Sequence, residues 1–269
     1  MYRSIGFAIR AALLAGALLA PALTAAGENA AAPTSATQAG PVSPEAQAVL
    51  DRMTSYLRGL QEFSVESRSS RDEVVEFGYK LQHNERVNLV VARPNQLRAD
   101  VSGDVSNRSY VFDGAALMIY SADDQAYIRT KVPVSLPQLL ENMLAAGIEM
   151  PLIDVLYQSM TGTLTDAVRG GVLVGDSTID GVACDQLAFR QADIDWQLWV
   201  EKGERPLPRK ILITTRHEVG EPQFQAVLTW NTKPAIGPQT FAFAPPKEAV
   251  EIPFRASVAL DAPANGEAK

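Results

Sequence analysis

The residue types that most often do chemistry in proteins are sparse in this chain, which has two histidines and one cysteine among 269 residues. His83 lies in "LQHNE" and His217 in "TTRHE", both polar surroundings. Neither histidine has a second ligand at the spacing of a metal site. We therefore favour solvated surface histidines over metal ligands at both positions.

Cys184, in "VACDQLAF", has no nearby base that could activate its thiol. The sequence favours a buried, space-filling cysteine over a reactive one. One cysteine cannot form an internal disulfide, so the fold must be held by its hydrophobic core.

Carboxylates gather between residues 176 and 195, and a run of this kind could bind calcium. Its aspartates are Asp176, Asp180, Asp185, Asp193 and Asp195. They are spread through a predicted hairpin rather than held in one loop, so solvation of turns and edges is the favoured interpretation. The chain has no Gly-x-Ser-x-Gly, phosphate-loop or dinucleotide motif. We predict no catalytic residue, no metal and no cofactor, and an enzyme is not favoured.

Two tryptophans three residues apart lie in "IDWQLWVE", residues 194–201. In a strand, Trp196 falls on a wholly apolar face and Trp199 on a polar one, because side chains alternate across a sheet. "FQAVLTW", residues 224–230, likewise places four apolar residues on one face. Trp199 is expected to pack across strands on the outer face. Trp196 is either ordinary core under a helix or the wall of a ligand site.

Helical patterns occur at two places. Residues 43–63 predict a helix with Ser43 as its cap and Pro44 in its first turn. Residues 134–160 are apolar at helical spacing, and Gly147 and Pro151 divide them into two short helices. Helices apolar on nearly every side are buried or cover an apolar surface.

Most of the remaining sequence alternates like strands, from residue 86 onward. Asp-Gly pairs at 113–114 and 180–181, and Asp-Asp at 123–124, mark hairpin turns. The order is helix, meander, two helices, meander. This order predicts an α+β fold with one large antiparallel sheet, which at this length tends to curl or close.

The N-terminus predicts export. Residues 1–26 have two arginines, an apolar stretch and small residues before a predicted cut near Ala26, as in a secretory signal peptide. Residues 27–43 and 257–269 are small, polar and proline-containing, so we expect a disordered linker and a disordered tail. One domain is predicted over residues 44–256.

The net charge of the chain disfavours two kinds of partner. The net charge is −7, and removal of the signal peptide makes it two units more negative. Nucleic-acid binding and strong adhesion to anionic lipid are disfavoured, because both call for a basic surface. An acidic chain suits a protein that stays mobile between membranes.

Three motifs resemble the periplasmic lipoprotein carrier LolA. They are "VNLVVARPNQLRADV", the Asp-Gly hairpin "SYVFDGAALMIYSADDQ" and the closing "FAFAPPKEAVEI", in the family's order and at comparable spacing. "DGVACDQLAFRQADIDWQLWVEKGERPLPRKILIT" further resembles a family of predicted periplasmic proteins of unknown function with a LolA/LolB-like fold. The resemblance covers about residues 44–252, with a longer insert in the second half.

This resemblance implies an incomplete β-barrel wrapped around an N-terminal helix and a short helical lid, with a concave apolar face that holds acyl chains. Arg93 matches the family's arginine that hydrogen-bonds the lid, although a surface charge before a turn remains an alternative. The family's phenylalanine after that stretch is Leu97 here, which weakens any claim of identical cargo. Face parity and helix apolarity predict a cavity lined by Trp196, Leu198, Val200, Phe224, Leu228, Trp230, Leu139, Met143 and Leu156.

The resemblance therefore implies a periplasmic binder or carrier of a lipid, an acyl chain or a lipid-modified molecule. Its implied partners are donor and acceptor proteins at the inner and outer membranes, and the chain is expected to be a monomer. The alternative is a periplasmic sensor that reads lipids or lipoproteins and signals to a membrane partner.

Overall fold

The computed structural model describes residues 42–254, apart from residues 149, 151, 162–163 and 166. The predicted signal peptide, nearly all of the predicted linker, the predicted tail and the proline of the predicted lid joint lie outside the described residues.

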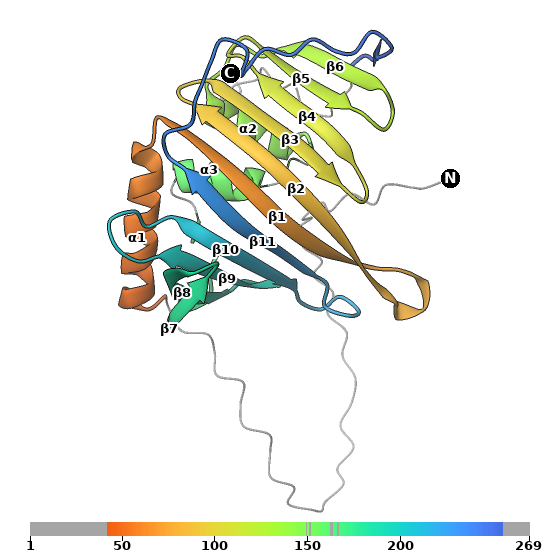
Figure 1. The fold of residues 1–269 in the computed structure, drawn as a ribbon. Helices are drawn as coiled ribbons and strands as arrows, with labels where there is room; N and C mark the ends of the chain where they lie inside the picture. Colours follow the sequence, from red (N-terminus) through yellow and green to blue (C-terminus); the bar gives the residue numbers. More distant parts are fainter. Residues whose placement is uncertain (1–41, 149, 151, 162–163, 166, 255–269) are drawn as a thin grey trace, which may run out of the picture. The chain divides into compact units, whose positions relative to one another are not determined.

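One sheet of 12 strands dominates this region, and its spatial order is β12-β6-β5-β4-β3-β2-β1-β11-β10-β9-β8-β7. All neighbours are antiparallel except β12 and β6. The strands are β1 (Glu62–Val74), β2 (Lys80–Ala92), β3 (Gln96–Gly103), β4 (Asn107–Phe112), β5 (Ala116–Ser121), β6 (Ala126–Lys131), β7 (Gly170–Ile179), β8 (Val182–Arg190), β9 (Ile194–Glu201), β10 (Pro208–Thr215), β11 (Gln223–Asn231) and β12 (Val250–Glu251). The sheet is thus two meanders joined where β1 pairs with β11 (Figure 1).

The predicted hairpin turns are confirmed. Asp113 Oδ1 accepts hydrogen bonds from the backbone N–H of Ala115 at 2.9 Å and of Ala116 at 2.8 Å, which closes the β4–β5 turn. Asp180 and Gly181 both have positive φ, 46° and 80°, as a tight hairpin turn between β7 and β8 requires. Local turn chemistry therefore makes β4 and β5, and likewise β7 and β8, antiparallel neighbours.

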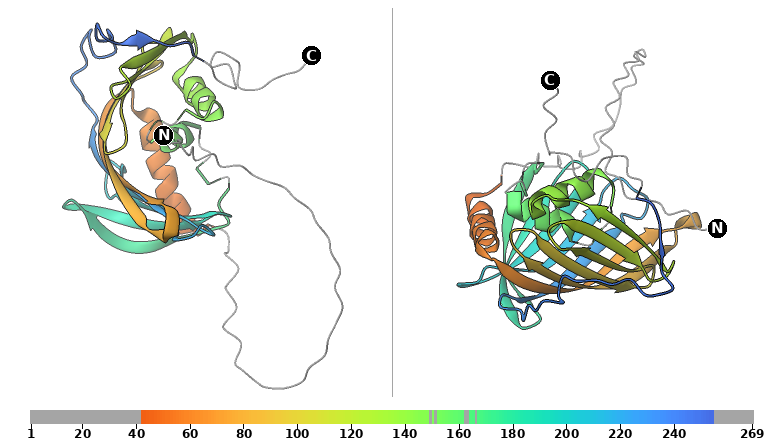
Figure 2. Two further views of the ribbon diagram at one scale, coloured as in Figure 1. Left: turned by 90° about the vertical axis from the view of Figure 1, so that its right-hand side faces the viewer. Right: turned by 90° about the horizontal axis from the view of Figure 1, so that it is seen from above.

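The sheet is strongly curved and does not close, and the helices lie on its concave side (Figure 2). They are α1 (Pro44–Gly59), α2 (Leu136–Ala145) and α3 (Ile153–Thr161), with a short 3-10 turn, η1, at Glu76–Gly78. The predicted fold class, an α+β fold with an incomplete barrel around helices, is confirmed. No described helix is long and apolar enough to cross a membrane.

Helix α1 begins as predicted and ends earlier than predicted. Ser43 Oγ accepts a hydrogen bond from Ala46 N at 3.2 Å, with Pro44 at the first helical position. The helix ends at Gly59, and Glu62 and Phe63, predicted as its last turn, instead begin β1. Strand β1 was not predicted, because Ser67 and Ser69 occupy inward positions where an apolar pattern would have marked a strand.

The hydrophobic core lies between the concave face of the sheet and the three helices. At one end, Phe189 stacks on Trp196 with ring centroids 4.1 Å apart. On its other side Phe189 covers Gly171, where an added Cβ would lie 2.4 Å from its ring. The absence of a side chain at residue 171 is what allows this aromatic stack to reach the edge strand.

We predict that Gly171→Ala lowers the free energy of unfolding by about 1–3 kcal/mol, because Phe189 is buried and cannot move aside without disturbing Trp196. The matched control is Gly59→Ala in the last turn of α1, where an added Cβ meets nothing within 4 Å. That variant is expected to be neutral or more stable. Thermal and denaturant unfolding test both, and equal stability of the two variants would contradict the account.

Candidate functional site

An apolar pocket lies where the ends of β1, β2, β10 and β11 meet α1 and α3. Its volume is about 30 Å³. Its walls are Leu57, Phe63, Val65, Leu89, Arg93, Leu152, Leu156, Met160, Pro208, Leu228 and Trp230. One water needs about 10–15 Å³ measured in this way, so the closed pocket is too small for an acyl chain. Helix α3 contributes Leu156 and Met160 to this wall.

Two aromatic rings form the sheet side of the pocket. Phe63 and Trp230 approach with ring centroids 5.5 Å apart. Trp230 Nε1 donates a hydrogen bond to the Pro208 carbonyl at 2.7 Å, so its one polar atom is satisfied. The indole ring can therefore line an apolar space without an unpaired polar group.

Arg93 is the one charged residue of the pocket wall. Its Nη2 donates to the Leu57 carbonyl near the end of α1 at 3.3 Å. Its Nε is buried and has no hydrogen-bond partner among the described residues. Burial lowers the pKa of the Arg93 guanidinium, although arginine stays charged at neutral pH. A charge with an unused donor next to an apolar pocket is costly in a purely structural role.

The hydrogen bond of Arg93 differs from the one expected of a lid latch, because it goes to α1 rather than to the segment of α2 and α3. Arg93 nevertheless shares the pocket with Leu156 and Met160 of α3. The backbone links this corner to α2 as well, since Leu136 N donates to the Pro94 carbonyl at 3.2 Å. A latching role of Arg93 stays a prediction.

The motifs that carry the family resemblance meet in space. Asn95, of the Arg-Pro-Asn stretch, packs over Gly114 of the Asp-Gly hairpin, where an added Cβ would lie 2.4 Å from Asn95 Nδ2. Gly114 has a φ of 96°. Both observations require glycine at residue 114. The two motifs thus form one packed corner of the fold.

The joint between α2 and α3 contains two left-handed residues. Gly147 has a φ of 69°, and the hydrogen bonds from Gly147 N to Leu144 O and from Ile148 N to Met143 O end α2 in a Schellman motif. Leu152 has a φ of 65°, which is strained for a large side chain, and it lines the pocket. Proline at residue 147 would lose both the positive φ and the N–H donor, so it would not be a neutral way to stiffen the joint.

The predicted cavity residues divide into two groups. Leu156, Leu228 and Trp230 line the pocket. The others lie in the core or pack against it, away from the pocket wall: Trp196, Leu198, Val200, Leu139, Met143 and Phe224. Face parity of the strands and apolarity of the helices placed these side chains in the interior but could not tell which of them border an unfilled space.

The pocket also contains residues that sequence reasoning missed, above all Phe63 and Val65 of β1 and Leu89 of β2. The alternation of Phe63 and Val65 in "EFSVES" was a usable signal, because both face inward next to Leu89 and Val91. It was hidden by the prediction that the helix continued through residue 63.

The two tryptophans lie on opposite faces, as predicted. Trp196 is in the core, whereas Trp199 packs on the outer face, donates Nε1–H to Ser177 Oγ at 3.2 Å and lies under Lys210 Nζ, 5.0 Å from its ring centroid. The Trp196 Nε1 atom is buried without a partner among the described residues.

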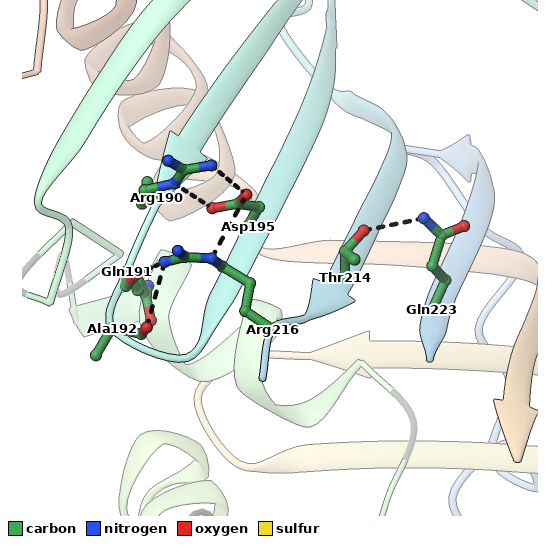
Figure 3. A network of polar contacts seen from close by, with 7 residues as sticks. All are labelled: Arg190, Gln191, Ala192, Asp195, Thr214, Arg216 and Gln223. Carbon is green, nitrogen blue, oxygen red and sulfur yellow. Dashed lines mark hydrogen bonds and ion pairs between the residues drawn. The ribbon is translucent and has the colours of Figure 1, made fainter. Parts of the chain in front are cut away.

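Four aspartates of the acidic run, Asp176, Asp180, Asp185 and Asp195, are each paired with a lysine or an arginine. No cluster of three or more metal-ligating residues occurs in the part of the chain that the structure describes. Asp195 accepts two hydrogen bonds from Arg190, both at 2.7 Å (Figure 3). Arg216 lies 3.9 Å from the same carboxylate and donates to the carbonyls of Gln191 and Ala192. This network ties the β8–β9 turn to the end of β10.

The cysteine and the two histidines lie in surroundings typical of residues with a structural role. Cys184 is buried, and burial raises the pKa of its thiol, which disfavours the nucleophilic thiolate. His83 Nε2 lies 2.7 Å from Glu73 Oε2 near the end of the β1–β2 hairpin. His217 is exposed in the β10–β11 turn.

Residues 46–255 match the family described as "Predicted periplasmic protein (DUF2092)". A search of curated proteins gives no match. Similar solved structures include an uncharacterized conserved protein from Thermus thermophilus, with 11% identity, a TM-score of 0.46, and 78% of this chain and 99% of that chain covered. Another is the lipoprotein LppX of Mycobacterium tuberculosis, with 14% identity, a TM-score of 0.45 and coverage of 72% and 100%. A third is a LolA superfamily protein from Nitrosomonas europaea, with 10% identity, a TM-score of 0.36 and coverage of 73% and 97%.

The Asp195 network gives a pH prediction. Hydrogen bonds from Arg190 hold the pKa of Asp195 below its ordinary value of 3.8, with burial opposing them. The native pKa is thus below the unfolded one, so the stabilisation is present above the unfolded pKa and is lost as the pH falls through the native one.

Asp195→Asn should therefore lower stability near neutral pH by less than about 1 kcal/mol, and its difference from the wild type should shrink below the ordinary aspartate pKa. Asp193→Asn, a change at an exposed neighbour, should have little effect at either pH. Urea unfolding at several pH values measures this. A constant difference across the pH range would contradict the assignment.

Proposed function

The chain belongs to the DUF2092 family of predicted periplasmic proteins and has a LolA-like incomplete barrel, and from this we propose that it binds a lipid, an acyl chain or a lipid-modified molecule beneath α3. The binder acts as a carrier that shields the apolar part of its cargo from water. The observation that carries the proposal is the apolar pocket under α3 with the partly unpaired Arg93 in its wall.

The free energy that it costs to move α3 and the free energy gained by burying an acyl chain are of similar size. Moving α3 exposes Leu152, Leu156 and Met160 to water, at a cost of about 1.5–3 kcal/mol for each fully exposed side chain. A buried acyl chain contributes about 0.8 kcal/mol per methylene, so about ten methylenes offset that cost. A balance of this kind allows a cargo to be held and then released when a partner favours the open form.

The unpaired donor of Arg93 favours a cargo that carries an oxygen-rich group at one end of the cargo's apolar part. Its unpaired Nε is a buried donor, and a carboxylate, phosphate or ester oxygen would satisfy it. The phenylalanine and tryptophan of the wall would then face the chain, while the guanidinium faces the head of the molecule.

The strained joint supports opening at α3. Leu152, with positive φ, stands immediately before α3, whereas the Schellman motif holds the end of α2 in a defined geometry. Strain that is released when α3 turns would lower the cost of opening. Donor and acceptor proteins at the two membranes are part of the proposal, as the partners that favour the open form.

A pair of leucine variants tests the pocket. Leu156→Ala and Leu140→Ala each remove a buried leucine and should each cost about 2–5 kcal/mol of stability. Only Leu156 lines the pocket, so only Leu156→Ala lowers the cost of opening and should tighten binding of a fluorescent fatty acid about tenfold. Fluorescence titration measures the affinity. Equal affinities of the two variants, or no binding by the wild type, would refute the pocket.

Arg93→Leu tests the polar end of the site. We expect the affinity for a fluorescent fatty acid to fall about tenfold, since a hydrogen bond to a charged group contributes about 1.5–3 kcal/mol. Binding of an uncharged lipophilic dye should change little, and so should the stability of the sheet. An equal loss for both probes would show that Arg93 acts only through packing.

Transfer of a lipid between membranes distinguishes a carrier from a sensor. The wild-type protein should move a fluorescent lipid between two vesicle populations faster than spontaneous exchange. Tight binding without any transfer would contradict the carrier and favour the periplasmic sensor.

A further inference from the structure

The end of the β1–β2 hairpin presents a large aromatic side chain to water in a strained conformation. Phe77, in the turn between the two strands, is 94% exposed and has a φ of 64°. Glycine and asparagine adopt this region readily, whereas a phenylalanine in it is an outlier. Exposure and backbone strain both disfavour phenylalanine here, so neither folding nor solubility accounts for it.

Other apolar side chains gather at this end of the molecule. Tyr79, just before β2, is 69% exposed, and Leu81 in β2 is 46% exposed. The neighbouring β10–β11 turn presents Val219, which is 79% exposed. We call this end, formed by residues 75–81 and 217–221, the tip, and its hairpin projects at the lower right of Figure 1.

The tip is held in shape by its own contacts. Val75 N donates to the Tyr79 carbonyl at 3.0 Å, which closes the hairpin. Asp72 accepts hydrogen bonds from Lys80 Nζ and from the backbone N–H of Gln223, both at 3.1 Å, so it joins the hairpin to β11. Burial alone would raise the pKa of Asp72, but these hydrogen bonds outweigh burial and lower it. The apolar side chains thus stand on a preorganised base.

The charge around the tip is negative. Glu76, Glu218 and Glu221 are exposed and make no ion pair with any described residue. Carboxylates repel an anionic lipid surface, where each positive charge would instead contribute about 1 kcal/mol of attraction. They are compatible with zwitterionic headgroups, whose outermost ammonium groups are positive.

The size of the tip favours a lipid surface over a protein partner. A stable protein interface buries about 800 Å² on each side. An aromatic side chain buries about 150–250 Å², so the apolar side chains of two convex turns provide roughly half of that area. Insertion between lipid headgroups needs no such continuous area, because each apolar side chain partitions separately.

We propose that the tip docks the protein weakly and reversibly on membranes of zwitterionic lipid, with Phe77 and Tyr79 inserted among the headgroups. The proposal goes beyond cargo binding, because the tip lies at the opposite ends of β1 and β2 from the pocket wall and needs no occupied pocket. A weak contact of this kind suits a protein that must leave the membrane again.

Flotation with vesicles of phosphatidylcholine and phosphatidylethanolamine tests the tip, using protein secreted to and purified from the periplasm of an expression host. We expect the wild type to float with the vesicles and Phe77→Asn to bind about tenfold more weakly. Thermal stability of Phe77→Asn should be unchanged or higher, because asparagine tolerates the left-handed region. All variants share the same N-terminal segment, so their differences report the tip alone.

Three comparisons sharpen the result. Val172→Asn replaces an exposed valine on β7 and should bind like the wild type. Adding phosphatidylglycerol should weaken wild-type binding, and Glu76→Lys should reverse that preference. Fatty-acid binding by Phe77→Asn should be normal, so a failed pocket and a failed tip are distinguishable.

Equal flotation of Phe77→Asn and Val172→Asn would overturn the proposal. Stronger wild-type binding to the anionic vesicles would also overturn it. Absence of flotation with any vesicle would overturn it as well, and would indicate a protein partner for the tip.

Discussion

An open sheet cannot bury its own concave face, and this constraint governs the structure. The two meanders join through β1 and β11 into one curved sheet whose apolar side has no second sheet to cover it. Three short helices supply the cover, and α3 is preceded by Leu152, whose positive φ is strained for a large side chain. The pocket lies between this cover and the ends of β1, β2, β10 and β11. Leu156 of α3 belongs to both the hydrophobic core and the pocket wall.

Unpaired polar atoms inside this core mark positions where hydrophobic packing alone does not explain the residue type. The buried side-chain atoms without a hydrogen-bond partner among the described residues are Ser67 Oγ, Arg93 Nε and Trp196 Nε1. Leaving a buried donor unpaired costs about 1–3 kcal/mol. Of these, only Arg93 borders the pocket, and it is also the only charged one. A guest with an oxygen atom at that position would remove the cost, which links the internal energetics of the fold to the proposed binding.

The outer face of the sheet is polar and charged. Its charges pair with one another across neighbouring strands, as Arg190 does with Asp195 and Arg209 with Glu201. Exposed pairs contribute little to stability, so the sheet depends on its apolar concave face rather than on these charges. The tip departs from this pattern, because its carboxylates are unpaired and its apolar groups are exposed. Cargo binding and membrane contact are thus proposed for opposite kinds of surface, one concave and buried and the other convex and wet.

Several features were determined by the sequence alone because they depend on local chemistry. Ser43 and Pro44 determine where α1 begins, Asp113-Gly114 and Asp180-Gly181 determine two of the turns, and period-two alternation assigns Trp196 and Trp199 to opposite faces. These are effects of neighbouring residues, and a single chain contains them in full. The order of the helices and meanders, and hence the fold class, follows from such local signals.

Tertiary structure decided what depends on residues far apart in the chain. Strand β1 reads as polar because Ser67 and Ser69 point inward, and it is a strand only because both β2 and β11 pair with it. Face parity selected Leu198 and Leu228 equally, yet only Leu228 borders the pocket, since an unfilled space depends on how α3 meets the sheet. The family resemblance implied a hydrogen bond from Arg93 to the lid, whereas the guanidinium donates to Leu57 O near the end of α1 at 3.3 Å. Periodicity tells which side of a strand faces inward, but only the packing of distant elements determines what lies opposite.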